Sequence, residues 1–224
     1  STDPVAADAT GARIIQAIRD FFTRQGFLEV ETPIRSPAVI PEGHIDPMKS
    51  GGSFLAASPE LYMKRLLSGG FQKIFQICKT FRKDERGPMH LPELTLLEWY
   101  ETGADYTDLM KQCQDMIRFV ALRTGHGDSL IYQGKKIRLA VPWDRITVEN
   151  AFQAYSRVSL KDALETGRFD EIVSFDIEPV LGCPVPAFLV DYPETMAALA
   201  RLNPEPSGRL PGIRTAQRTE CYIS

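Results

Sequence analysis

Residues 73–102 read KIFQICKTFRKDERGPMHLPELTLLEWYET, and this stretch decides the fold. Its two ends, residues 73–83 and 93–102, alternate between apolar and polar side chains, which is typical of strands. The polar segment 84–92 between them contains one glycine and two prolines, which predicts a loop. The stretch therefore predicts two antiparallel strands joined by a long loop.

Side chains on a strand alternate between its faces, so the second strand places Leu94, Leu96, Glu98 and Tyr100 on one side. A carboxylate among apolar neighbours is costly unless a cation meets it. One interpretation is a salt bridge to a Lys or Arg of the protein itself. The other is that the cation belongs to a ligand, with the Tyr100 hydroxyl as a second contact.

Arg82 ends the first strand, and a charged run that includes His90 follows it. Such a run is usually a solvated hairpin tip. An arginine is also suited to hold phosphate or carboxylate oxygens with its planar fork of donors. An Arg at the strand end, a His nearby and Glu98 opposite would hold an anionic phosphate beside a cationic substrate.

The rest of the chain predicts helices and strands separated by Gly and Pro. Expected helices cover residues 12–25, 58–68, 105–124, 147–155, 169–181 and 193–202. Expected strands cover residues 27–33, 129–140 (as a hairpin), 186–193 and 215–224, and expected loops cover 34–53 and 203–213. This mixture predicts an α+β fold, without a regular βαβ alternation. The sequence also contains no P-loop and no Rossmann glycine motif, so any nucleotide is bound by other means.

Composition is that of a globular protein: 224 residues, 43% apolar, 25% charged, and a formal net charge of −3. This length predicts one large domain. The charge argues against a protein that mainly coats phosphate backbones, although a local basic patch remains compatible with it. No apolar run approaches the length of a membrane span, and the first residues show no signal pattern.

The four cysteines are spread along the chain, which favours free thiols in a reducing cytoplasm. The three histidines, His44, His90 and His126, are also far apart. A metal site built from neighbouring residues is therefore not expected, although carboxylates could hold a magnesium ion.

Residues 80–100, TFRKDERGPMHLPELTLLEWY, resemble the second signature motif of class II aminoacyl-tRNA synthetases, FRxE…HxPEFTxLExY. Residues 11–33 resemble the first motif, a long helix followed by a strand that ends in Pro33. Residues 57–82, 188–201 and 216–224 are similar to the lysine branch of that family. The resemblance covers essentially the whole chain.

This resemblance implies one class II catalytic domain over residues 1–224, an antiparallel sheet flanked by helices, that uses ATP and Mg²⁺ and forms a homodimer. A short branch of the family attaches lysine or β-lysine to a lysine side chain of elongation factor P. The string HLPELTLLEWY with Trp99 favours that branch, as does a start about ten residues before the first motif, which leaves no room for an anticodon-binding OB domain.

Three other functions remain open at this point. The chain is also similar to the catalytic domain of a lysine–tRNA ligase acting on tRNA-Lys. The others are a non-catalytic, synthetase-like binding module and a small-molecule amide ligase similar to asparagine synthetase A.

Carried over by position, the resemblance also implies site residues. The amino-acid pocket would contain Ser58, Pro59, Glu60, Glu98 and Tyr100. The ATP site would contain Arg82, Lys83, Asp84, Glu85, His90, Leu91 and Leu94. Arg82 would be the catalytic residue, because it would bind both the α-phosphate and the substrate carboxylate. Glu60 would lie near the α-ammonium and His90 near the outer phosphates.

Three positions depart from the family pattern. Asp84 stands where the family has Glu, Leu91 where it often has Asn, and Leu94 where an aromatic residue usually stacks on adenine. Leu94 can cover a base by dispersion but lacks aromatic stacking, which predicts weaker ATP binding.

The family pattern continues beyond Ser224 with a strand and a third motif, which supply a magnesium-binding acid, a lysine-binding acid and an Arg over the adenine. No metal ligand is therefore expected within these 224 residues. They are expected not to form an adenylate alone, and lysine-dependent pyrophosphate exchange at the rate of an intact enzyme would contradict this.

Overall fold

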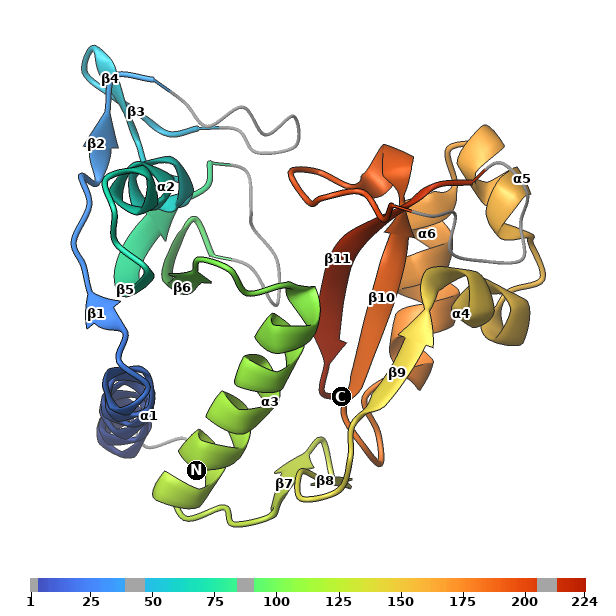
Figure 1. The fold of residues 1–224 in the computed structure, drawn as a ribbon. Coiled ribbons are helices and arrows are strands. Elements are labelled where there is room, and N and C mark those ends of the chain that lie inside the picture. The colour runs from blue at the N-terminus through green and yellow to red at the C-terminus, as the bar shows by residue number, and fades with distance from the viewer. Residues whose placement is uncertain (1–3, 39–46, 84–90, 205–212) are drawn as a thin grey trace. The chain divides into compact units, whose positions relative to one another are not determined.

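The computed structural model describes residues 4–38, 47–83, 91–204 and 213–224, which divide into two compact units (Figure 1). Residues Ile18–Ala104 form one of them, which we call the hairpin unit. Ser1–Ala17 and Asp105–Ser224 form the other, which we call the sheet unit. Helix α1 (Pro4–Arg24) contributes residues to both. No helix among the described residues is long and apolar enough to cross a membrane.

The hairpin unit contains two three-stranded sheets. Its elements after α1 are β1 (Leu28–Glu29), β2 (Arg35–Ser36), β3 (Lys49–Ser50), β4 (Ser53–Leu55), α2 (Glu60–Ser68), β5 (Lys73–Phe81) and β6 (Glu93–Glu101). The larger sheet has the order β1-β5-β6, and the smaller has the order β2-β4-β3. The β5–β6 hairpin is the antiparallel pair predicted from the sequence, whereas residues 84–90 of the predicted loop lie outside the described residues.

Aromatic side chains hold one face of the hairpin against α1. The Phe22 ring is fully buried and stacks on Phe75 of β5, with ring centroids 5.0 Å apart. It also lies 5.4 Å from the Trp99 ring of β6 and 5.1 Å from Phe27. Because Phe75 and Trp99 are directly paired across the strands, they share a face. The opposite face of the hairpin carries the remaining side chains, among them Gln76 and Glu98.

Two expectations for this unit need correction. Residues 34–53 are not only a loop, because β2, β3 and β4 pair within and just beyond them. Gly51 closes the β3–β4 turn with a φ of 61°, a conformation that favours glycine, so the glycines mark a hairpin. The strand expected over 27–33 is limited to Leu28–Glu29, which pair in parallel with Ile74 and Phe75.

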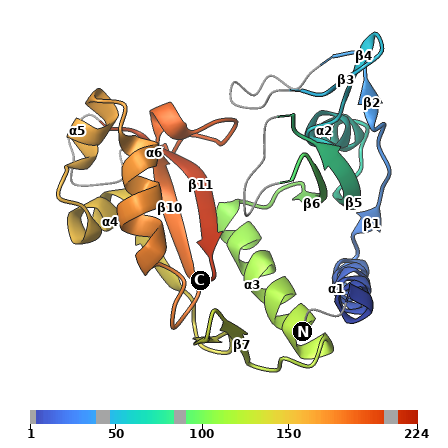
Figure 2. The same cartoon turned by 180° about the vertical axis from the view of Figure 1, so that it is seen from behind.

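The sheet unit has three layers (Figures 1 and 2). Its elements are α3 (Tyr106–Arg123), β7 (Ser129–Tyr132), β8 (Lys135–Arg138), β9 (Asp144–Thr147), α4 (Val148–Tyr155), α5 (Leu160–Glu165), α6 (Phe169–Ile172), η1 (Val173–Ile177), η2 (Glu178–Val180), β10 (Ala187–Pro193), η3 (Glu194–Met196) and β11 (Thr215–Tyr222). The central sheet has the order β11-β10-β9.

Alternation along β10 explains the layers of this unit. Phe188 and Val190 pack in one cluster with Met110 of α3. Leu189 belongs to a second cluster with Phe152 of α4. Helix α3 therefore covers one face of the sheet, and α4 to α6 cover the other, as both views show (Figure 2).

Other expectations for the two units are met only in part. The described strands form separate small sheets instead of one antiparallel sheet, and the pairs β1/β5 and β9/β10 are parallel. The helix expected over 193–202 is a single turn, η3, because the chain turns at Ala198 with a φ of 49°. The helix expected over 169–181 begins as α6 and continues as the π- and 3₁₀-helical segments η1 and η2.

We expect Thr147→Ala to lower the free energy of unfolding by about 1 kcal/mol. Thr147 caps α4, since its side-chain oxygen accepts a hydrogen bond from the Asn150 N–H at 3.1 Å. The alanine variant leaves that donor without its partner. Urea denaturation measures the change, and Thr147→Ser, which keeps the hydroxyl, is the control. Equal stability of the alanine variant and the wild type would contradict the role of this cap.

Candidate active site

One face of the β5–β6 hairpin, which we call the site face, gathers the polar side chains singled out from the sequence. Gln76 is paired directly with Glu98, so both lie on this face. The ladder continues past β5, because the Arg82 N–H donates to the Pro92 carbonyl at 2.9 Å. Alternation along this ladder places Arg82 on the same face as Gln76 and Glu98. The register therefore puts positions 82 and 98 on one face of the hairpin.

Two hydroxyl groups hold the Glu98 carboxylate. The Ser58 hydroxyl donates a short hydrogen bond to Oε1, and the Tyr100 hydroxyl donates to Oε2 at 3.0 Å. Ser58 is 7% exposed, so the first of these bonds is shielded from water. Hydroxyl donors orient a carboxylate without neutralising it. Ser58 and Tyr100 therefore fix the orientation of the Glu98 carboxylate.

The pKa of Cys78, on the same face, is influenced by Glu98. Burial is the main cause that raises the pKa of the Cys78 thiol to about 11, and the Glu98 charge raises it further. Cys78 is paired with Leu96, the residue two positions before Glu98 on the site face. Glu98 therefore lies close enough to β5 to influence Cys78.

We expect alkylation of Cys78 by iodoacetamide to accelerate up to about pH 11, because the thiolate is the reactive form. Because the folded pKa lies above the ordinary value, Cys78 also favours the folded state below about pH 9, and this contribution is lost as the pH rises towards 11. Glu98→Gln removes the nearby charge, so it should lower this pKa and speed alkylation at pH 9. Peptide mass spectrometry measures both effects, with Glu101→Gln as the control, and an unchanged rate in Glu98→Gln would contradict the proximity.

The turn before α2 is tied to the same carboxylate. The Ser58 oxygen also accepts from the Glu60 N–H at 3.1 Å, and α2 begins at Glu60. Pro59 occupies the position directly before the helix. Glu60 Oε1 lies 2.5 Å from Lys64 Nζ, and the Glu60 side chain is 16% exposed. Ser58 thus joins this turn to Glu98, 40 residues further along the chain.

The other predicted ATP-site residues are distributed unevenly. Leu94 is half-buried on the site face, opposite Thr80. Lys83 is exposed directly after Arg82, and Leu91 is 69% exposed. Asp84, Glu85 and His90 lie outside the described residues.

The described part of the chain contains no cluster of side chains suited to bind Mg²⁺. No group of three or more His, Cys, Asp or Glu side chains gathers there in a way that could hold a metal ion. Mg²⁺ coordination requires several oxygen ligands. We therefore assign no residue to Mg²⁺ and derive no step through it.

Sequence reasoning assigned no role to a polar cluster in the sheet unit. Arg218 donates to Glu220 at 2.5 Å, and its guanidinium lies 4.5 Å from the centre of the Tyr192 ring. The Tyr222 hydroxyl donates to the other Glu220 oxygen at 2.8 Å, and burial is the main cause that raises the Tyr222 pKa. Arg218, Glu220 and Tyr222 are spaced two residues apart on one strand, and this spacing in the sequence could have indicated that they share a face.

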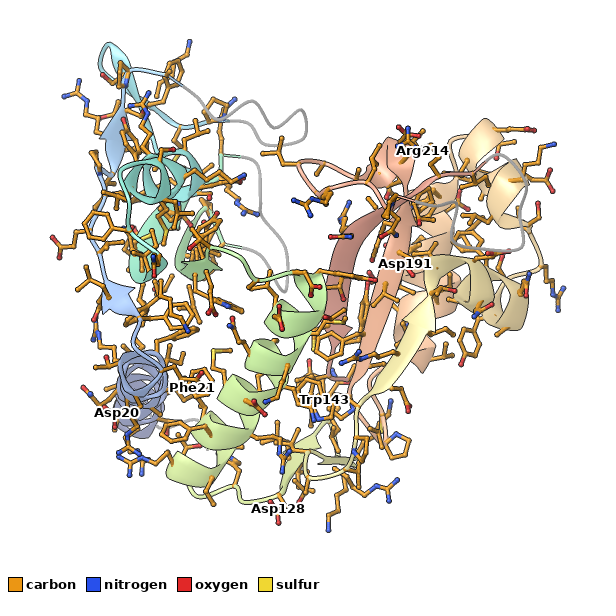
Figure 3. All side chains as sticks on the ribbon, viewed as in Figure 1. Asp20, Phe21, Asp128, Trp143, Asp191 and Arg214 are labelled. Atoms are coloured by element: carbon orange, nitrogen blue, oxygen red, sulfur yellow. The ribbon has the colours of Figure 1, made fainter. Side chains whose placement is uncertain are left out.

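A second network that sequence reasoning did not find centres on Asp191 of β10 (Figure 3). Its Oδ1 accepts from the Tyr106 hydroxyl at 3.0 Å and from Asn203 Nδ2 at 3.2 Å. Asp191 has a φ of 58° at an irregularity in the β10–β11 register. The network connects the start of α3 to β10 and to the segment before β11.

The chain as a whole matches a known class of ligase. The family of class II tRNA synthetases (D, K and N) matches residues 9–224, so the chain belongs to this family, as the motifs predicted. Within it, the chain is related to lysine-activating ligases.

Three relatives illustrate the similarity. The elongation factor P–(R)-β-lysine ligase of Vibrio atlanticus is 35% identical over 95% of this chain and 68% of its own length. The protein of the same name from Pectobacterium carotovorum is 36% identical over the same shares. The lysine–tRNA ligase of an Azoarcus species is 35% identical over 87% of this chain and 44% of its own length.

Proposed function

We propose that this protein uses ATP to activate lysine or β-lysine and transfers the aminoacyl group to a lysine side chain of elongation factor P. The names of the Vibrio and Pectobacterium relatives support the acceptor and the β-lysine substrate. The observation that carries the proposal is the site face itself. It combines a carboxylate held by two hydroxyls with an arginine further along the same ladder.

The substrate is placed by these two charges. The ammonium of the lysine side chain binds Glu98, with the Tyr100 hydroxyl beside it. The backbone levels of Glu98 and Arg82 are about 20 Å apart, because a strand rises about 3.3 Å per residue and Arg82 follows Gln76 by six residues. We place an extended amino acid followed by a phosphate group along this interval, between the two side chains.

Activation joins the substrate carboxylate to ATP. The carboxylate oxygen attacks the α-phosphorus, forms the mixed anhydride and releases pyrophosphate. Arg82 holds the carboxylate and the α-phosphate in line and stabilises the charge that develops on the phosphate oxygens. The amine of the acceptor lysine then attacks the activated carbonyl, which forms an amide bond and releases AMP.

Other predicted residues complete the proposed site. Ser58 and Pro59 shape the turn beside the side-chain ammonium of the substrate. Glu60 binds the α-ammonium, so the Glu60 carboxylate is either shared between Lys64 and the substrate or released by Lys64. Lys83, Leu91 and Leu94 flank ATP, together with Asp84, Glu85 and His90. We also expect a cytoplasmic homodimer that uses ATP with Mg²⁺.

The second candidate function is lysine attachment to tRNA-Lys, which the Azoarcus relative favours. Both functions share the activation step, so only the acceptor distinguishes them. A non-catalytic binding module would bind lysine without forming the adenylate.

Mass spectrometry of elongation factor P tests the proposal. The intact protein is incubated with ATP, the factor and either lysine isomer, and a parallel reaction contains tRNA-Lys in place of the factor. We expect the factor to gain the mass of one lysyl unit and the tRNA to remain uncharged. Charged tRNA with an unmodified factor would favour the second candidate, and neither product would favour the binding module.

A further inference from the structure

We propose that Gln76 of β5 is a second group that binds the cationic end of the substrate, where its side-chain oxygen accepts a hydrogen bond from the ammonium. This role rests on the proposed function, because it concerns the same site. It adds a specificity-determining residue that neither the motifs nor the residue-by-residue resemblance singled out.

The first observation is a buried acceptor in need of a donor. Gln76 is 4% exposed, and its Oε1 has no hydrogen-bond partner among the described residues. Leaving such an acceptor unsatisfied costs about 1–3 kcal/mol, so folded proteins contain few of them. A ligand that donates to Gln76 would remove this cost on binding.

The second observation is its place in the ladder. Gln76 is the direct cross-strand partner of Glu98, so the two β-carbons lie about 5 Å apart on the site face. The Ser58 and Tyr100 hydroxyls do not donate to Gln76 in this arrangement, because each donates its single proton to Glu98. The side chain opposite Gln76 is the Glu98 carboxylate, which is itself an acceptor.

Two facing acceptors define the chemistry of the ligand. An ammonium group carries three donors, so it can bond to the Glu98 carboxylate and to the Gln76 oxygen at once. The amide carries no charge, so the pair presents a single negative charge that matches a single ammonium. A methyl group in the same place would leave the Gln76 oxygen without a donor and would bring no counter-charge to the Glu98 carboxylate, which predicts rejection of norleucine.

Calorimetry with lysine tests the proposal. Gln76→Met keeps the length of the side chain and removes the acceptor, so we expect about ten- to one-hundredfold weaker binding of lysine. Without ligand, this variant is expected to melt at the wild-type temperature or higher, because an unsatisfied buried amide is replaced by an apolar group. Gln76→Glu keeps an acceptor oxygen and is expected to restore the binding lost in Gln76→Met.

Gln72→Met is the matched control, since Gln72 is an exposed glutamine directly before β5. It should change neither lysine affinity nor melting temperature. Wild-type affinity in Gln76→Met would overturn the proposal, as would a lower melting temperature or a failure to fold, because either would show a structural role. A wild-type protein that binds no lysine would instead overturn the proposed function, and the role of Gln76 with it.

Discussion

Arg82→Ala is expected to slow lysine activation by about 100-fold or more, with a much smaller effect on folding. In the proposed reaction its guanidinium stabilises charge that appears on the α-phosphate only as the carboxylate attacks. Its position at the end of the ladder, where its N–H bonds to the Pro92 carbonyl, does not depend on the side chain. Lysine-dependent exchange of pyrophosphate into ATP by the intact protein measures the rate, and thermal unfolding measures the fold.

Lys79→Ala is the control for this variant. Lys79 is an exposed cation on the same strand but on the opposite face, and it pairs with Glu93 at 3.3 Å. Its loss should leave lysine activation unchanged. An Arg82→Ala protein that melts at a lower temperature but activates lysine normally would contradict the catalytic assignment.

Glu98→Gln is expected to reduce kcat/KM for lysine by about 100-fold or more, because a desolvated ammonium loses its counter-charge. The amide keeps the size of the side chain, so the loss should fall on selectivity: lysine and its neutral isostere norleucine should become nearly equivalent. Competition between the two in the pyrophosphate-exchange assay measures this ratio.

The matched control is Glu101→Gln. Glu101 lies on the same strand but on the other face, where it pairs with Lys73 at 2.7 Å. This variant should keep the preference for lysine over norleucine. Undiminished discrimination in Glu98→Gln would show that another residue recognises the ammonium.

Local chemistry explains the elements that the sequence predicted well. Helix α3 begins after Asp105, whose side chain accepts hydrogen bonds from the Thr107 and Asp108 N–H groups. An aspartate directly before a helical pattern is a typical cap. The β7–β8 hairpin turns at Gln133 and Gly134, whose φ angles of 48° and 78° suit a two-residue turn. In β5 and β6 the strict alternation is enough to assign Arg82 and Glu98 to one face.

Non-local contacts account for what the sequence did not predict. The parallel pair β9/β10 is separated in the chain by α4 to α6, and the four residues of β9 carry too short a pattern to identify. The hydrogen bond from Ser58 to Glu98 likewise joins segments far apart in sequence. Gln76 looks like one polar residue of an alternating strand until its burial and its partner across the ladder are known.

A crystal structure of the protein with a stable analogue of lysyl-adenylate tests the central claim most directly. We expect the side-chain ammonium within hydrogen-bonding distance of the Glu98 carboxylate and the group that replaces the α-phosphate against the Arg82 guanidinium. An analogue bound with its ammonium away from Glu98, or on the opposite face of the hairpin, would contradict the account.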